Sequence, residues 1–173
     1  RRAAISAGAK GRARYAPAVA DHKADVVDAL RELAELTALE EGSPQSFRVR
    51  AYENAMRAVQ AMAEDPGSLT VAQLTKKDGI GKSTAQKIQE LVTTGRIDKL
   101  EALRQAWPRA VVELSHIPGV GPKAVKKLRS ELGIESVADL RAALDAQKIR
   151  TLAGFGAKSE EKIKKAIERL GLD

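Results

Sequence analysis

Apolar residues recur every three to four positions along most of the chain, which predicts a series of short amphipathic helices. In the first stretch, residues 24–40, the apolar positions are Val26, Val27, Leu30, Leu33, Leu36 and Leu39. Further helices are expected near 44–63, 71–75, 84–94, 97–106, 108–115, 122–132, 137–146 and 157–170. No stretch alternates apolar and polar residues for long enough to predict a strand. The expected fold class is therefore all-α, built from short helices.

Residues typical of helix ends bound several of these stretches. A glycine follows four of them, at Gly42, Gly95, Gly133 and Gly171, where it can adopt the left-handed conformation that ends a helix. Ser43 and Pro44 are expected to begin the second helix, as its N-cap and its first residue. The residues expected on the inner side of that helix are Phe47, Ala51, Ala55, Met56 and Val59.

A Gly-apolar-Gly sequence occurs three times, at residues 79–81, 119–121 and 154–156, each time between a shorter and a longer expected helix. Each copy has a lysine one or two residues after its second glycine: Lys82, Lys123 and Lys158. Each also has a lysine eight residues after its first glycine: Lys87, Lys127 and Lys162. Repetition in matched surroundings predicts three helix-hairpin-helix motifs.

Such a hairpin is suited to hold a phosphate. Its glycines permit a positive φ and leave no side chain to keep a partner away. The apolar residue between them is expected to plug the space between the two helices, so that amides of the turn and of the next helix point outward. These amides and the helix dipole attract an anion, and the lysine adds charge. Each Gly-apolar-Gly could be only a tight turn, but three copies with lysines favour phosphate binding, without preference for base sequence.

The net charge of +7 is unevenly distributed and supports a polyanionic partner. Residues 1–14 carry +5, residues 15–74 carry −5, and the two remaining stretches, 75–104 and 105–173, carry +3 and +4. The chain has no cysteine, which excludes disulfides, thiol catalysis and cysteine metal sites. No apolar run reaches the length of a membrane span. A P-loop is also excluded, because Lys76 stands where that motif requires its first glycine.

Four segments together resemble the N-terminal region of family X DNA polymerases, most closely the bacterial, polymerase beta-like branch. They are residues 46–59 (SFRVRAYENAMRAV), 79–88 (GIGKSTAQKI), 94–100 (TGRIDKL) and 117–122 (IPGVGP). The resemblance covers about residues 24–170 and implies two domains. Residues 1–21 lie before it and do not match; their Ala, Gly and Arg content predicts a basic tail that is disordered or a linker. Residues 22–104 form a lyase-like domain with the first hairpin, and residues 105–173 form a tandem helix-hairpin-helix domain.

The resemblance also implies roles for individual residues. Lys87 falls on the lysine that forms a Schiff base with a 5′-deoxyribose phosphate or an abasic site, and Phe47 falls on a ring that contacts a DNA base. The implied 5′-phosphate pocket consists of Arg48, Tyr52, Ser83 and Lys99. The DNA phosphates would be held at Gly79, Gly81, Lys82, Gly119, Gly121, Lys123, Gly154, Gly156 and Lys158. A Na⁺ or K⁺ ion is implied at the backbone carbonyls of Thr75, Lys77 and Ile80, and another at those of Ser115, Ile117 and Val120.

The chemistry of a Schiff base adds one expectation about Lys87. An amine attacks an aldehyde only when neutral, and a solvated lysine is almost fully protonated at neutral pH. Like charges nearby disfavour the protonated form, so we expect the pKa of Lys87 to be lowered by Lys76, Lys77, Lys82, Arg96 and Lys99. Lys127 and Lys162 occupy the same repeat position without any implied chemistry, so a structural role for Lys87 stays open.

Three functions are therefore compared. The first is DNA binding in repair, at gaps, nicks or ends, with lyase activity through Lys87 and no cofactor for that step. The second is a non-catalytic DNA-binding module or scaffold, so whether the chain is an enzyme stays open. The third is a protein adaptor whose hairpins only pack helices. The expected setting is the cytoplasm and nucleoid of a bacterium, with no membrane partner and with a polymerase region beyond this chain.

Overall fold

The computed structural model describes residues 21–172, and within this range every regular element is a helix, as the all-α prediction requires. The longer helices are α1 (Lys23–Glu41), α2 (Phe47–Ala61), α4 (Lys82–Thr94), α5 (Asp98–Ala106), α7 (Pro122–Leu132), α8 (Val137–Asp145) and α9 (Ala157–Leu170). The shorter ones are η1 (Pro66–Ser68), α3 (Val71–Thr75), α6 (Arg109–Leu114) and η2 (Ile149–Thr151). The expected basic tail lies outside the described residues, except for Asp21.

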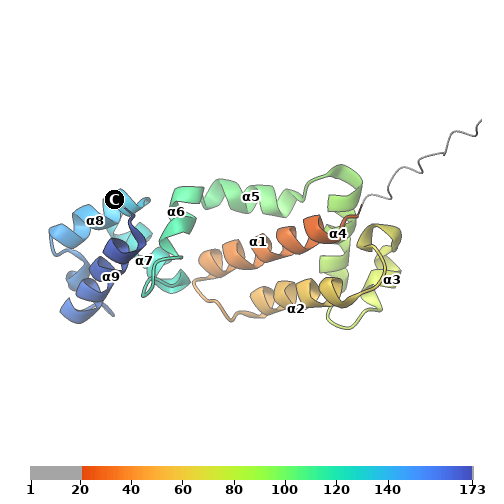
Figure 1. Cartoon of the computed structure of the whole chain (residues 1–173), viewed down its shortest axis with the longest axis horizontal. Helices are drawn as coiled ribbons and strands as arrows, with labels where there is room; N and C mark the ends of the chain where they lie inside the picture. The colour runs from red at the N-terminus through yellow and green to blue at the C-terminus, as the bar shows by residue number, and fades with distance from the viewer. Residues whose placement is uncertain (1–20, 173) are drawn as a thin grey trace, which may run out of the picture.

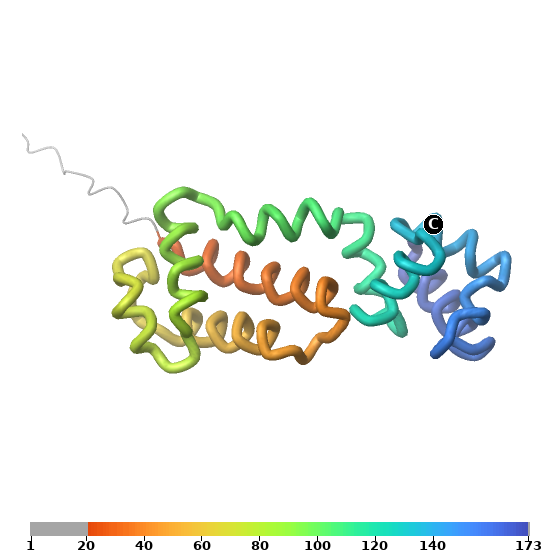
Figure 2. The backbone as a smooth tube through the Cα atoms, turned by 180° about the vertical axis from the view of Figure 1, so that it is seen from behind, coloured from red at the N-terminus to blue at the C-terminus, as the bar shows by residue number. Residues whose placement is uncertain are grey.

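Helix α1 is the centre of the first half of the molecule. It lies antiparallel to α2 and alongside α5, while α3 and α4 close one end of the group (Figures 1 and 2). Its leucines at positions 30, 33 and 39 are fully buried, because their spacing places them on the face covered by these neighbours. The apolar pattern that predicts α1 is thus also the pattern that assembles this half.

Helix α2 begins three residues later than the Ser43–Pro44 sequence predicts. Its N-cap is Ser46, whose hydroxyl accepts a hydrogen bond from the amide of Val49. Ser43 instead belongs to the turn that ends α1: its amide donates to the carbonyl of Ala38 at 3.0 Å, and its hydroxyl accepts from the amide of Gln45 at 3.3 Å. The residues between α1 and α2 form the turn in which the chain reverses its direction. The second helix is therefore present as predicted, but the prediction of its first residue was wrong.

Phe47 does not lie on the inner side of α2, contrary to the prediction. The buried residues of α2 are Val49, Tyr52, Ala55 and Val59. Phe47 precedes Val49 by two positions, or about 200° of helix rotation, so its ring points away from the core and is 87% exposed. It is one of only two large apolar side chains exposed among the described residues.

The second half contains α6 to α9 and joins the first half at α1 and α5 (Figure 1). Trp107 is buried at the end of α5, with the Arg129 guanidinium 5.0 Å from its ring centre. The boundary expected between residues 104 and 105 falls inside α5. Two contacts tie α1 to the second half: His116 Nε2 lies 2.5 Å from Glu35 Oε1, and Lys126 Nζ donates to the Glu40 carbonyl at 2.8 Å.

None of the helices within residues 21–172 combines the length and the apolar character needed to cross a membrane.

Candidate functional site

The three Gly-apolar-Gly turns have the same backbone conformation. The first glycine of each lies in the left-handed region, with φ of 92° at Gly79, 91° at Gly119 and 87° at Gly154. The second glycine of each is extended and is the N-cap of the following helix, α4, α7 or α9. The expected helix-hairpin-helix geometry is therefore present three times.

The residue between the two glycines closes each hairpin from inside. Ile80 and Val120 are 4% and 1% exposed, whereas the bulkier Phe155 is only half-buried. The amides of Ile80 and Val120 donate to the carbonyls of Lys77 and Ile117 at 3.2 and 2.9 Å, and Phe155 does the same with Leu152. The prediction that the amides of the turn point outward is thus wrong for this central amide, because it donates a hydrogen bond within the turn. The amides that stay available belong to the glycines and to the start of the next helix.

The helices that follow the hairpins begin without a side-chain cap. The N-caps of α2, α3 and α8 are Ser46, Thr70 and Ser136, and the hydroxyl of each accepts an amide hydrogen bond. No side chain caps α4, α7 or α9. Helices α1, α5 and α6 also lack a side-chain hydrogen bond from their N-cap residues, but only α4, α7 and α9 follow a Gly-apolar-Gly turn. Because unpaired amides at a helix start attract anions, each of the three hairpins presents donors to an anion.

Space and charge at these starts suit an anion as large as a phosphate. A Cβ atom built on Gly81, Gly121 or Gly156 would have no neighbour within 4 Å. The lysines of the repeat, Lys82, Lys123 and Lys158, are exposed beside these open positions. The structure places every predicted phosphate-binding residue at one of the three hairpins.

A cavity of about 470 Å³ opens between α1, α2, α4 and α5. It brings together the predicted Schiff-base lysine, base-contacting ring and 5′-phosphate pocket, which are Lys87, Phe47, Arg48, Tyr52, Ser83 and Lys99. The other residues that line it, which sequence reasoning did not identify, are Thr37, Glu40, Ala51 and Thr84. The cavity therefore combines two amines and a guanidinium with several hydroxyls and one carboxylate.

Lys87 is half-buried in this cavity, and its Nζ donates to Ser83 Oγ at 2.9 Å. Burial lowers the pKa of Lys87 below its usual value, and Lys99 and Arg48 lower it further, against the opposing effect of Glu90. The direction agrees with the prediction, but the main cause does not, because burial outweighs the crowding by cations. Of the five cations expected to act, only Lys99 does. Folding therefore increases the fraction of neutral amine at a given pH.

The equivalent lysine of the second hairpin has a different role. Lys127 Nζ donates to the carbonyl of Ala153, just before the first glycine of the third hairpin. This contact ties α7 to the neighbouring turn. The same repeat position therefore supports packing in α7 and lines a cavity in α4.

The other cations of the cavity are held loosely by carboxylates. Arg48 Nε lies 3.8 Å from Glu41 Oε1, and Lys99 Nζ lies 3.9 Å from Glu40 Oε2. These distances exceed that of a hydrogen bond, so both cations can turn to an incoming anion. Burial raises the pKa of the Tyr52 phenol, which keeps the hydroxyl protonated at neutral pH as a hydrogen-bond donor.

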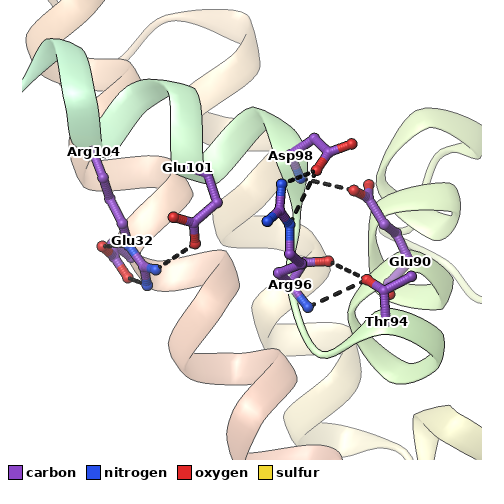
Figure 3. Close-up of polar contacts among 7 residues, drawn as sticks. All are labelled: Glu32, Glu90, Thr94, Arg96, Asp98, Glu101 and Arg104. Carbon is purple, nitrogen blue, oxygen red and sulfur yellow. Dashed lines mark hydrogen bonds and ion pairs between the residues drawn. The ribbon is translucent and has the colours of Figure 1, made fainter.

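Glu90 fixes the start of the helix that carries Lys99. Its Oε1 accepts a hydrogen bond from the Asp98 amide at 2.7 Å, and Arg96 pairs with Asp98 at 3.0 Å (Figure 3). Farther along α5, the Nε and Nη2 atoms of Arg104 donate to the two carboxylate oxygens of Glu32 on α1, and its Nη1 donates to Glu101 (Figure 3). These contacts hold α5 against α4 and α1, so Lys99 stays at the rim of the cavity.

Thr37 is the least expected residue of the cavity. It is 4% exposed, and its hydroxyl has no hydrogen-bond partner among the described residues. The only signal in the sequence is a polar residue on the apolar stripe of α1, four positions after Leu33. A buried hydroxyl without a partner costs stability.

Replacing this hydroxyl by a methyl group is expected to stabilise the chain. Thr37→Val keeps the shape of the side chain and removes the unpaired polar atom, so we expect the free energy of unfolding to rise by about 1 kcal/mol. Urea unfolding of both proteins measures the difference. A loss of stability would mean that Thr37 already has a partner within the folded chain.

Within residues 21–172, no group of three or more His, Asp or Glu side chains is arranged to hold a metal ion.

Two family models and a curated bacterial protein match the chain. Residues 21–97 match a helix-hairpin-helix domain, and residues 111–169 match a SAM-like helix-hairpin-helix tandem. The chain is 36% identical over 151 residues to the DNA polymerase/3′-5′ exonuclease PolX of Bacillus subtilis. This alignment covers 87% of the chain and 26% of the relative, so the chain spans about a quarter of that protein.

Proposed function

Since the chain contains two helix-hairpin-helix matches and is similar over most of its length to PolX of Bacillus subtilis, we propose that it binds DNA through backbone phosphates. The observation that carries this proposal is the threefold occurrence of a positive-φ glycine followed by an uncapped helix start and an exposed lysine. The name of the relative, a DNA polymerase and exonuclease, supports DNA as the polyanion.

Each hairpin holds a phosphate through the amide of its second glycine and the first free amides of the next helix. In α7 the first helical residue, Pro122, has no amide hydrogen, so the donors there begin with Gly121 and Lys123. Lys82, Lys123 and Lys158 supply the countercharge. These contacts reach only the phosphate oxygens, so affinity does not depend on the base sequence. Gaps, nicks and ends during repair, in the bacterial cytoplasm and nucleoid, are the DNA sites we propose.

Salt dependence tests this mode of binding. With one lysine neutralising a phosphate at each of three hairpins, the logarithm of the association constant is expected to fall with the logarithm of salt concentration with a slope of about −3. The titration uses a chain that begins at residue 21, because the five basic residues of segment 1–14 could bind DNA unaided. Weak binding that does not depend on salt would favour the adaptor function instead.

The cavity adds a lyase step to this proposal. A 5′-deoxyribose phosphate carries an aldehyde and a phosphate, and the cavity combines a lysine of lowered pKa with further cations and hydroxyls. Lys87 attacks the aldehyde and forms an imine with loss of water. Arg48, Tyr52, Ser83 and Lys99 bind the phosphate, and the exposed ring of Phe47 stacks on a base at the entrance. Borohydride reduction of the imine tests this step.

A monovalent cation at the first two hairpins completes the proposal. The carbonyls of Lys77 and Ile117 each accept one amide hydrogen bond inside the turn, and a carbonyl has a second lone pair. Together with the carbonyls of Thr75 and Ile80, or of Ser115 and Val120, they form an oxygen donor set that fits Na⁺ or K⁺. The ion would supply positive charge between the hairpin and a DNA phosphate.

A non-catalytic DNA-binding module is the alternative, and the packing role of Lys127 favours it, since lysine at this repeat position can serve the fold alone. Such a module would bind the same DNA and form no imine.

A further inference from the structure

The lyase chemistry needs a base, and the cavity contains one carboxylate, that of Glu40. After the imine forms, a proton must leave C2′ of the sugar before the strand is released. Neither the repeat nor the family resemblance identified a group for this step. The acidic residues around the cavity are therefore the candidates for this base.

The other nearby acids are engaged elsewhere. Glu90 accepts the Asp98 amide at 2.7 Å, and Glu41 lies 3.8 Å from Arg48; neither lines the cavity. The carboxylate of Glu40 is 49% exposed, and its nearest cation is Lys99 at 3.9 Å. That separation leaves both of its oxygens able to accept a proton.

A second polar residue of α1 lies on the same wall of the cavity. Thr37 precedes Glu40 by three residues on α1, so the two side chains lie on the same face of the helix. Thr37 also lines the cavity, and its buried hydroxyl has no partner among the described residues. Lys87 comes from α4 and Glu40 from α1, so a sugar bound in the cavity has the amine on one wall and the carboxylate on another.

We propose that Glu40 is the general base of the elimination, an inference that rests on the proposed lyase function. Lys87 forms a protonated imine with C1′ and releases water. Glu40 takes the proton from C2′, and the electrons of that C–H bond form the C1′=C2′ bond of an enamine. The enamine then forms the C2′=C3′ bond, and the C3′–O bond breaks, so the DNA phosphate leaves with the bonding pair. Water hydrolyses the remaining imine and restores the Lys87 amine.

The test separates imine formation from elimination. The substrate is gapped DNA with a 5′-deoxyribose phosphate, and two quantities are measured: the adduct trapped by borohydride and the rate of sugar release without borohydride. For Glu40→Gln we expect release to slow about 100-fold, the effect of losing a general base, with the trapped adduct retained. Retention of the adduct also shows that the variant is folded and binds the DNA. Glu40→Asp is expected to recover part of the rate.

The control removes one negative charge from the same helix. Asp28→Asn lies on the exposed face of α1, where Asp28 pairs only with Arg31 among the described residues, and it should release the sugar at the wild-type rate. Wild-type release by Glu40→Gln, or loss of its adduct together with release, would overturn the role of Glu40 as the base. Absence of any adduct with the unmodified chain would instead contradict the lyase function itself.

Discussion

Lys87→Ala is expected to abolish the borohydride-trapped adduct between the chain and DNA that carries a 5′-deoxyribose phosphate. Only two of the residues that line the cavity have an amine, Lys87 and Lys99. Lys87 is the half-buried one, and burial holds its pKa below the usual value. An amine must be neutral to attack an aldehyde, so the lysine with the lowered pKa is the one that reacts. The measurement is the amount of covalent protein–DNA product on a denaturing gel.

Two variants control for the loss of charge. Lys99→Ala removes the other amine and a phosphate contact, so it is expected to weaken binding while the adduct still forms at saturating protein. Lys162→Ala removes the equivalent lysine of the third hairpin, which is exposed on α9, and should keep the adduct at its normal level. An adduct that persists in Lys87→Ala, or that disappears equally in all three variants, would refute the assignment.

Aspartate at the three hairpin N-caps is expected to remove DNA binding without unfolding the chain. Gly81, Gly121 and Gly156 are extended, with ψ of 168°, 179° and 177°, which is the conformation that an N-cap aspartate adopts. Nothing lies within 4 Å of a Cβ atom at these positions. The new carboxylate would accept the amides that otherwise bind the phosphate and would repel it.

The expected loss is large because each charged hydrogen bond contributes about 1.5–3 kcal/mol. A single substitution should weaken binding about tenfold, and the triple variant about 100-fold or more. The melting temperature should stay within a few degrees of wild type, because Asp and Gly differ little at an N-cap. Titration of fluorescent DNA and thermal unfolding give the two values.

Ser136→Asp is the matched control, since it places an acidic cap on α8, which follows no hairpin. It is expected to leave DNA affinity within about twofold of wild type, because only one distant charge changes. If Ser136→Asp weakened binding as much as Gly121→Asp, the effect would be general repulsion and not loss of the hairpin donors.

The hairpins could be predicted from the sequence because their requirements are local. A turn that needs φ near 90° at one residue demands glycine there, so the repeated glycines reveal the turn wherever they occur. The same holds for the glycines that end α1, α4, α7 and α9 in the left-handed conformation. The start of α2 could not be predicted in this way, because Ser43 and Ser46 are both suitable N-caps. Only the structure shows that Ser43 belongs to the turn after α1.

The cavity depends on tertiary structure and was only partly predictable. Arg48, Tyr52, Ser83, Lys87 and Lys99 were identified through family resemblance, and nothing in their spacing shows that α2, α4 and α5 converge. Thr37 and Glu40 come from α1, which the resemblance did not connect with this site. In sequence, Thr37 is a slight irregularity in an apolar stripe and Glu40 one acid of a charged helix end, so only the packing of four helices reveals their shared environment.

Glu40 links two parts of the molecule through one residue. Its side chain lines the cavity. Its backbone carbonyl accepts a hydrogen bond from the Lys126 ammonium of α7, the helix that starts at the second hairpin. Contacts within the folded chain therefore set the distance between the cavity and that hairpin. A DNA substrate bound at both places, as proposed above, would have to match a separation that the fold sets.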